Sequence, residues 1–302
     1  MAAVTQEVPA IEHRDARKGV LLMLGGLALF SILNGVVKAQ AAIFPVNQIV
    51  FFRNGFGLIS LVLLMRWMGG MGLLRTSRPG AQFWQALCFT AVLIFMFFTY
   101  QHMPLADATA ISFLQPLLVV ILSAPLLGEK VSLSRWLAVA VGFAGVLLMV
   151  QPSGTGSLVG ALAAGIATLF SALCLIQQRF LSRHEETLTI VFYTMLFSSL
   201  IVSPSLFWAW VWPTPWQLAG LIAMGLASGF CQYVTTRAVF FAPVASVAPI
   251  KYTAMLWAIV IGYLWFGDVP TTPVLIGSSI VIVATLLVLK TPARRADPVV
   301  EP

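Results

Sequence analysis

Two basic residues lie deep inside apolar segments of this sequence, where a charge is costly and a functional site is the first hypothesis. Lys251 is eight residues past Pro243 in PVASVAPIKYTAMLW (243–257), and Arg53 is about eight residues into the apolar run 46–66. At a helical rise of about 1.5 Å per residue, each lies roughly 12 Å from the nearer membrane face. Neither head group can easily extend to water from that depth, so each needs polar partners inside the protein.

All ten acidic residues fall in tails, loops or helix ends, and the nearest to a span are Asp107, Glu129 and Asp268. A cavity with fixed positive charge and no central carboxylate favours substrates with an anionic or electron-rich group, such as a carboxylate or a flavin carbonyl. It disfavours polyamines and cationic drugs. For Lys251 we favour a substrate cavity, while structural hydrogen bonding and gating near the cytoplasmic mouth stay open. A titrating Lys251 would also allow proton coupling. Lys38 lies at a helix end and is expected to extend to the interface.

Polar and aromatic side chains in the same apolar segments are the other candidates for substrate contact. They are Asn34, Tyr100, Ser112, Phe113, Gln115, Gln177, Gln232, Tyr233, Tyr252 and Trp257. Single glutamines also hydrogen-bond neighbouring helices to one another, and aromatic rings also pack in cores or contact lipid, so each candidate has a structural alternative. The rings would suit a flat or apolar substrate through stacking. Pro116 is expected to kink its helix and free a carbonyl near the membrane midplane.

The sequence lacks the motifs of common enzyme classes. It contains no GxxxxGK[ST], HExxH or GxSxG, and no acidic metal cluster of the DDxxD type. GLASG (225–229) resembles part of an intramembrane serine protease, but His13, His102 and His184 all lie in tails or at span boundaries. The three cysteines lack the spacing of a metal site or a disulfide framework. We therefore expect no catalysis, no metal and no cofactor.

The elements that must position these residues are membrane helices. Of the 302 residues, 60% are hydrophobic and only 9% are charged, whereas about 25% are charged in ordinary soluble domains. A membrane-spanning helix needs about 20 mostly apolar residues. The segments that qualify are 19–38, 46–66, 82–101, 105–127, 132–150, 157–180, 187–209, 215–236, 243–266 and 271–289. The expected fold is an all-α membrane protein with ten transmembrane helices.

The basic residues predict the orientation of these helices. With the tails 1–18 and 290–302 in the cytoplasm, every Lys and Arg outside a span falls in a cytoplasmic segment. The outer loops AAIFP, HMP, QPSGTG, VWPTP and GDVPTTP contain none, which is the positive-inside pattern. The net charge of +7 is then a topology signal. We expect a multi-pass inner-membrane protein that contacts lipid and a small-molecule substrate, binds no nucleic acid and is compatible with a monomer.

The sequence also repeats itself at an offset of about 140 residues. LGGLALFSIL (24–33) aligns with AAGIATLFSAL (163–173), and PLADATAISFLQPLL (104–118) aligns with PVASVAPIKYTAMLW. We interpret 19–150 and 157–289 as two repeats of five helices. An odd number of helices makes the second repeat enter the membrane from the opposite side, so the repeats are inverted. Inverted repeats are typical of secondary transporters, which bind substrate near the bilayer midplane between the halves.

The residues that carry a family resemblance are MPLADATAISFLQPLLVVILSAPLLGEKVSLSRWLAVAVGFAGVLLMVQP and its counterpart YTAMLWAIVIGYLWFGDVP. They resemble EamA-type members of the drug/metabolite transporter superfamily, and the resemblance covers 19–290. It implies a central cavity lined mainly by helices 1, 3, 4, 6, 8 and 9, and a peripheral helix 2, which favours a structural role for Arg53. Family substrates range from amino acids and nucleoside-like metabolites to vitamins, amines and toxic compounds.

The resulting hypothesis is a secondary carrier that moves an amino acid or a related small metabolite across the inner membrane by alternating access, with export favoured. One alternative is an uptake carrier for a vitamin or nucleoside-like metabolite, such as riboflavin or S-adenosylmethionine. Another is a non-transporting scaffold or lipid-handling protein. Lys251 aligns with Ser112 of the first repeat, so this lysine departs from the symmetry and is our first candidate for selectivity.

Overall fold

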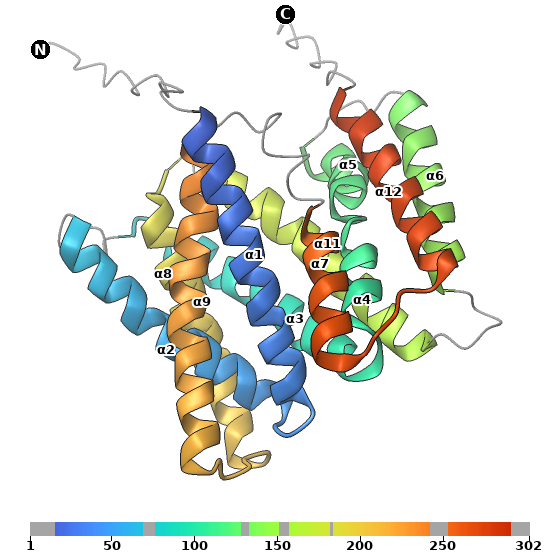
Figure 1. Cartoon of the computed structure of the whole chain (residues 1–302). Coiled ribbons are helices and arrows are strands. Elements are labelled where there is room, and N and C mark those ends of the chain that lie inside the picture. The colour runs from blue at the N-terminus through green and yellow to red at the C-terminus, as the bar shows by residue number, and fades with distance from the viewer. Residues whose placement is uncertain are drawn as a thin grey trace, which may run out of the picture.

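The computed structural model describes residues 16–68, 76–127, 133–150, 157–181, 184–241 and 253–290. In this part of the chain every regular element is a helix and no strand occurs (Figure 1). The elements in chain order are α1 (Ala16–Ala41), α2 (Val46–Met68), α3 (Pro79–His102), α4 (Leu105–Ser112), α5 (Gln115–Leu127), α6 (Leu133–Val150), α7 (Leu158–Leu181), α8 (Thr187–Val202), η2 (Ser203–Phe207), α9 (Pro215–Phe241), α11 (Thr253–Ile261), η3 (Gly262–Phe266) and α12 (Thr272–Lys290).

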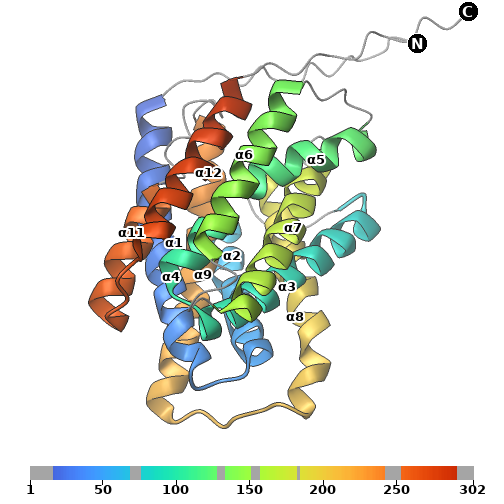
Figure 2. The same ribbon diagram turned by 90° about the vertical axis from the view of Figure 1, so that its right-hand side faces the viewer.

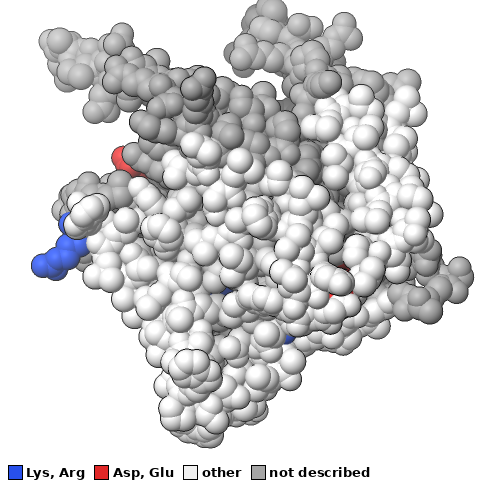
Figure 3. Space-filling model, in the orientation of Figure 1, with Lys and Arg blue, Asp and Glu red and all other residues white. Residues whose placement is uncertain are grey.

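Six helices in the described part of the chain are long and apolar enough to cross a membrane, namely α1, α2, α3, α7, α8 with η2, and α9. Three shorter apolar helical segments, Leu105–Val119, Thr253–Phe266 and Thr272–Ala284, accompany them. The face drawn in Figure 3 is covered almost entirely by uncharged residues, as contact with lipid requires. The chain is therefore a multi-pass membrane protein, and the described part of it is all-helical.

The predicted fourth span is divided into two helices near Pro116, where we expected only a kink. The helix stops at Ser112 and resumes at Gln115, which separates α4 from α5. Proline has no N–H and cannot donate to the carbonyl four residues earlier, which here belongs to Ser112. Two 3₁₀-type hydrogen bonds, from Phe113 to Ala110 and from Leu114 to Ile111, close the end of α4.

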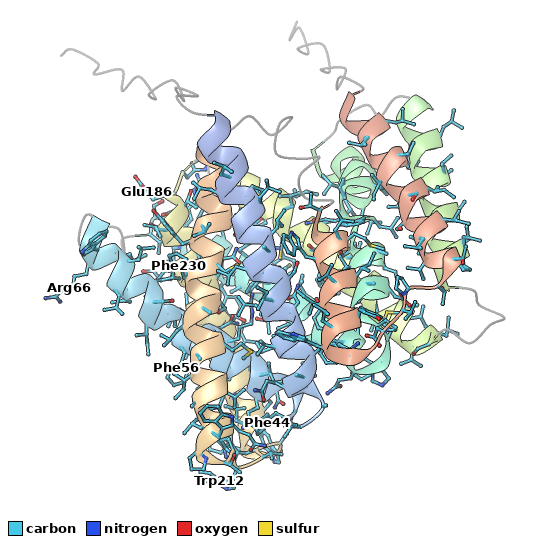
Figure 4. The ribbon with its side chains drawn as sticks, viewed as in Figure 1. Phe44, Phe56, Arg66, Glu186, Trp212 and Phe230 are labelled. Atoms are coloured by element: carbon cyan, nitrogen blue, oxygen red, sulfur yellow. The ribbon has the colours of Figure 1, made fainter. Side chains whose placement is uncertain are left out.

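The two ends of the helical region lie on one side of the molecule. α1 begins and α12 ends on the same side (Figure 1), which we call the terminal side. Arg66 and Glu186 lie toward the terminal side, whereas Trp212 lies at the opposite end (Figure 4). The chain that joins α8 to α9 also runs along this opposite side (Figure 2). Trp212, in the chain that joins α8 to α9, and the exposed Arg66 thus lie far apart in the molecule.

Helices α1 and α7 run in opposite senses. On the side opposite the chain ends, the Gln101 amide at the end of α3 donates to the carbonyl of Ala41 at the end of α1 (2.6 Å). On the same side, a Cβ at Gly160 near the start of α7 would lie 3.3 Å from His102 at the end of α3. α1 therefore ends on the side where α7 begins.

Two large core clusters hold the described helices together, besides a small one between α2 and α8. One joins α1, α2, α3 and α9, and includes Phe44, Phe52 and Tyr100. The other joins the α4–α5 region, α6, α7, α11 and α12, and includes Leu117 and Met255. Helices α6 and α12 lie side by side at the edge of the molecule in Figures 1 and 2. The contacts also pair α1 and α2 with α9, and α7 and α8 with α3.

The contact between α2 and α9 is unusually close because small residues face one another. A Cβ built on Gly225 would lie 2.5 Å from the backbone oxygen of Phe52, and one on Gly229 would lie 2.3 Å from that of Gly57. Small residues four apart allow membrane helices to approach in this way. The GLASG segment is therefore a helix-packing motif. Its Ser228 is 1% exposed and lies 2.8 Å from the backbone oxygens of Arg53 and Gly225.

Candidate functional site

A chain of buried polar side chains joins three helices around Arg53. Nη1 of Arg53 on α2 donates to Oδ1 of Asn54 (3.2 Å), and Nδ2 of Asn54 donates to Oγ of Ser198 on α8 (2.8 Å). Ser198 shares a hydrogen bond of 2.8 Å with Thr90 on α3. The Thr90 hydroxyl in turn donates to the carbonyl of Ala86 (2.7 Å). This chain holds Asn54, and through it the guanidinium, in a fixed position.

The surroundings of the Arg53 guanidinium are mostly aromatic. Only 5% of Arg53 is exposed, and its Cζ lies 5.9 Å from the centre of the Phe89 ring on α3. Tyr100, also on α3, is buried, stacks on Phe97, and is close enough to interact electrostatically with Arg53. The structure therefore brings together two predicted site residues, Arg53 and Tyr100. It also buries a residue of helix 2, a helix that the resemblance describes as peripheral.

The other predicted site residues are distributed over several interfaces. Gln115 donates to the carbonyl of Ser171 and so joins α5 to α7. Gln177 donates weakly to the carbonyl of Ala81 and joins α7 to α3. Ser112 donates to the carbonyl of Thr109 in its own helix (2.6 Å). These bonds match the structural alternative for isolated polar residues in membrane helices.

The remaining candidates differ in exposure. Phe113 is buried in the core cluster around α4 and α5, and Asn34, Gln232 and Tyr233 are partly buried on α1 and α9. Trp257 on α11 is exposed, as a ring in contact with lipid would be. Lys251 and Tyr252 lie outside the described residues. Their role in selectivity stays a prediction.

We expected Lys38 to extend to the membrane interface, but in the structure it is held by partners inside the protein. Its Nζ forms an ion pair with Oδ2 of Asp268 (2.5 Å) and lies 4.5 Å from the centre of the Phe266 ring. Asp107 at the start of α4 interacts electrostatically with both charges, and its buried Oδ1 has no hydrogen-bond partner among the described residues. A lysine and an aspartate from distant parts of the chain thus pair on the side opposite the chain ends, within electrostatic range of Asp107.

The local backbone positions Asp268 for this contact. η3 is a π-helical turn that ends at Gly267, whose φ of 69° lies in the left-handed region that glycine tolerates. The N–H of Gly267 donates to the carbonyl of Tyr263, and the N–H of Asp268 donates to that of Gly262. The turn is therefore held by its own backbone, and it directs the Asp268 carboxylate toward α1. π-helical turns are often found at functional sites.

Sequence reasoning missed several buried polar residues. Asn54, Ser198 and Thr90 complete the chain around Arg53, and only Asn54 was marked by a neighbouring charge in the sequence. Near the start of α3, both amide atoms of Gln82 and the Oε1 atom of Gln85 are buried without hydrogen-bond partners in the described part of the chain. A single threonine or glutamine in an apolar helix carries no sequence signal that distinguishes a site from a packing contact.

A surface groove of about 350 Å³ lies between α3 and α7. All of its lining residues are apolar, including Ile94, Phe98 and Leu162, and it opens on the outside of the helix bundle. Such a groove suits a lipid chain and offers no partner to a polar substrate. It is therefore separate from the Arg53 site.

Comparison with known proteins finds a transporter family and relatives that are named as transporters or exporters. The model of the EamA-like transporter family matches residues 17–151 and again residues 158–290. The pseudopaline exporter CntI of Pseudomonas aeruginosa (strain UCBPP-PA14) is 30% identical over 277 residues, which cover 91% of this chain and 97% of the relative. An S-adenosylmethionine uptake transporter of Rickettsia prowazekii (strain Madrid E) is 26% identical over 272 residues, covering 90% of this chain and 92% of the relative.

A riboflavin transporter of Vibrio cholerae (serotype O1, strain ATCC 39315 / El Tor Inaba N16961) is 25% identical over 301 residues, covering 95% of this chain and 97% of the relative. One crystal structure superposes on the fold with a TM-score of 0.64 and 18% sequence identity, covering 89% of this chain and 96% of that one. At that identity the superposition supports the fold alone.

Proposed function

This chain belongs to the EamA-like transporter family of the drug/metabolite transporter superfamily, and on that premise we propose a secondary carrier built from two inverted five-helix repeats, 19–150 and 157–289. The carrier moves a small metabolite across the inner membrane by alternating access. Transport of a small molecule follows from the family, and the repeat architecture and the mechanism are the parts that we propose.

The observation that carries the proposal is the exchange symmetry of the helix contacts. Replacing each helix of the first half by its counterpart in the second turns the α1–α9 contact into α7–α3, and α2–α9 into α8–α3, and all four are present. The α2–α8 and α6–α12 contacts map onto themselves, as contacts on a two-fold axis must. With α1 and α7 running in opposite senses, this pattern supports an inverted repeat. Such symmetry lets each half adopt the arrangement that the other has left.

An amino acid or a related metabolite is the proposed substrate, with export as the favoured direction. The buried positive charge of Arg53 favours a substrate that carries an anionic group, and a relative of 30% identity is named an exporter. The second candidate is uptake of a vitamin or nucleoside-like metabolite, which the names of the S-adenosylmethionine and riboflavin relatives favour. The two candidates differ in direction as well as in substrate.

Counterflow in proteoliposomes tests the carrier mechanism. Vesicles with purified protein are loaded with unlabelled amino acids, S-adenosylmethionine or riboflavin, and uptake of the same labelled compound is followed. A carrier gives a transient accumulation of label with its own substrate only. If no compound is exchanged above protein-free vesicles, the carrier loses its support and the scaffold alternative becomes the better explanation.

Cysteine labelling tests the proposed orientation, in which the terminal side is cytoplasmic. The native cysteines Cys88, Cys174 and Cys231 are buried, so a membrane-impermeant maleimide should report mainly on introduced cysteines. We expect Trp212→Cys, at a site that is 85% exposed, to be labelled from outside intact cells. Glu186→Cys, at the other end of the molecule (Figure 4), should be labelled only after permeabilisation. The reverse pattern would place both termini outside.

A further inference from the structure

Arg53 carries a charge for which the described residues supply no counter-ion. A guanidinium has five N–H donors, and among the described residues the side chain of Arg53 hydrogen-bonds to Asn54 alone. The described carboxylates lie elsewhere. Asp268 pairs with Lys38, Asp107 is within electrostatic range of that pair, Glu185 binds Thr76 and Ser77 in a surface loop, and Glu186 is exposed. A buried charge that lacks its partner is strongly destabilising. A contribution to the stability of the fold therefore does not explain why a charged residue is present at this position.

The neighbours of Arg53 position its guanidinium without neutralising it. Asn54 occupies one donor and is itself held by Ser198 on α8. The Phe89 ring contributes a cation–π contact, and the buried Tyr100 presents a hydroxyl within electrostatic range. The remaining donors form a planar fork in a dry setting, where a charge-assisted hydrogen bond is strong.

We propose that Arg53 binds the carboxylate of the transported molecule, so that this carrier selects metabolites with a carboxylate group. A planar carboxylate matches the guanidinium fork through two parallel hydrogen bonds. One carboxylate also balances one arginine, whereas a phosphate dianion would leave a negative charge uncompensated in the same dry space. The inference rests on the proposed carrier function and assigns the substrate group that this site recognises.

Paired probes separate the carboxylate from the rest of the substrate. Each of the twenty standard amino acids and its C-terminal amide is tested singly by counterflow and by thermal shift of the purified full-length protein. We expect wild type to exchange at least one acid and to prefer it to its amide by at least about 30-fold, as the loss of a buried charge-assisted pair predicts. Arg53→Gln should remove this preference, and Arg53→Lys should retain part of it.

Stability distinguishes binding from a structural role. Without ligand, Arg53→Gln should leave the Tm unchanged or higher, because it removes an unpaired buried charge. If Arg53 had a structural role, Arg53→Gln would instead lower the Tm and would reduce the exchange of acid and amide equally. Arg66→Gln, which removes an exposed arginine at the end of the same helix, serves as the control and should change neither exchange nor selectivity.

Four outcomes would overturn the proposal. If wild type exchanges acid and amide equally, the carrier function stands and the assignment of Arg53 fails. If chloride raises the Tm as much as any acid does, with methanesulfonate as the reference anion, the site binds a small inorganic anion. If no acid and no amide is exchanged while riboflavin, which has no carboxylate, is exchanged, the carboxylate assignment fails. If nothing is exchanged, the proposed function fails and this inference with it.

Discussion

Gly229→Ala should prevent α9 from packing on α2 and lower the Tm of the purified protein by at least about 5 °C. The added Cβ would lie 2.1 Å from Oγ of Ser60 and 2.3 Å from the carbonyl oxygen of Gly57. A flexible side chain can move away, but the backbone of α2 cannot do so without separating the helices. Overpacking in a well-packed core typically costs about 1–3 kcal/mol, and a backbone clash on this scale should exceed that range.

A thiol-reactive fluorophore can follow this unfolding, because Cys231 is buried in α9 itself. Gly165→Ala is the matched control, since its Cβ would meet nothing within 4 Å, and we expect its Tm to match wild type. We expect Gly142→Ala to lower the Tm by an intermediate amount, because the added Cβ clashes with the movable end of the Leu117 side chain. Equal Tm values for the Gly229 and Gly165 variants would mean that α2 and α9 do not pack as closely as described.

Neutralising either member of the Lys38–Asp268 pair should slow substrate exchange by at least about tenfold. The pair joins α1 to the turn after η3, two segments that belong to different halves of the proposed repeat and that we expect to separate and rejoin if the carrier works by alternating access. Lys38→Met would leave Asp268 and Asp107 facing each other without a cation. Because both partners are partly exposed, the cost should be about 1–3 kcal/mol, below that of a fully buried pair.

The reversed pair, Lys38→Asp with Asp268→Lys, tests whether the contact itself matters. We expect it to recover part of the exchange lost by either single reversal, measured as initial counterflow rates with matched protein content. Glu186→Gln, which removes an exposed charge far from this pair, should behave as wild type. Single variants that exchange at the wild-type rate would show that the pair plays no part in the transport cycle.

Much of this fold was predictable because a bilayer constrains the sequence strongly. Apolar runs of about 20 residues mark spans, and the described helices follow the predicted runs closely, with Pro116 separating α4 from α5. The family could also be recognised from the repeat and its Pro and Gly-acid positions. The ten-span arrangement itself stays a prediction, since parts of the predicted ninth and other segments lie outside the described residues.

The site was less predictable, for a physical reason. In a soluble helix the polar face reveals which side is buried, but in lipid both faces are apolar and burial leaves no periodic signal. The sequence therefore gave no reason to choose Thr90 and Ser198 over other small polar residues, although both are buried beside Asn54. Trp257 shows the opposite error: we predicted a site residue, but its ring is exposed. An apolar sequence context does not separate the two cases, because lipid accommodates an aromatic ring as readily as a core does.

The sequence by itself determined that the chain is a multi-pass helical membrane protein of a transporter family, and that Arg53 lies deep in a span. These properties depend on local composition and chain order. The tertiary structure decided which charges have partners: Lys38 pairs with Asp268, 230 residues away. The buried guanidinium of Arg53 lies over Phe89 of α3 and, among the described residues, makes one side-chain hydrogen bond. Pairing depends on which helices meet, and helices in lipid meet through close packing and polar contacts rather than through a hydrophobic pattern that can be read along the chain.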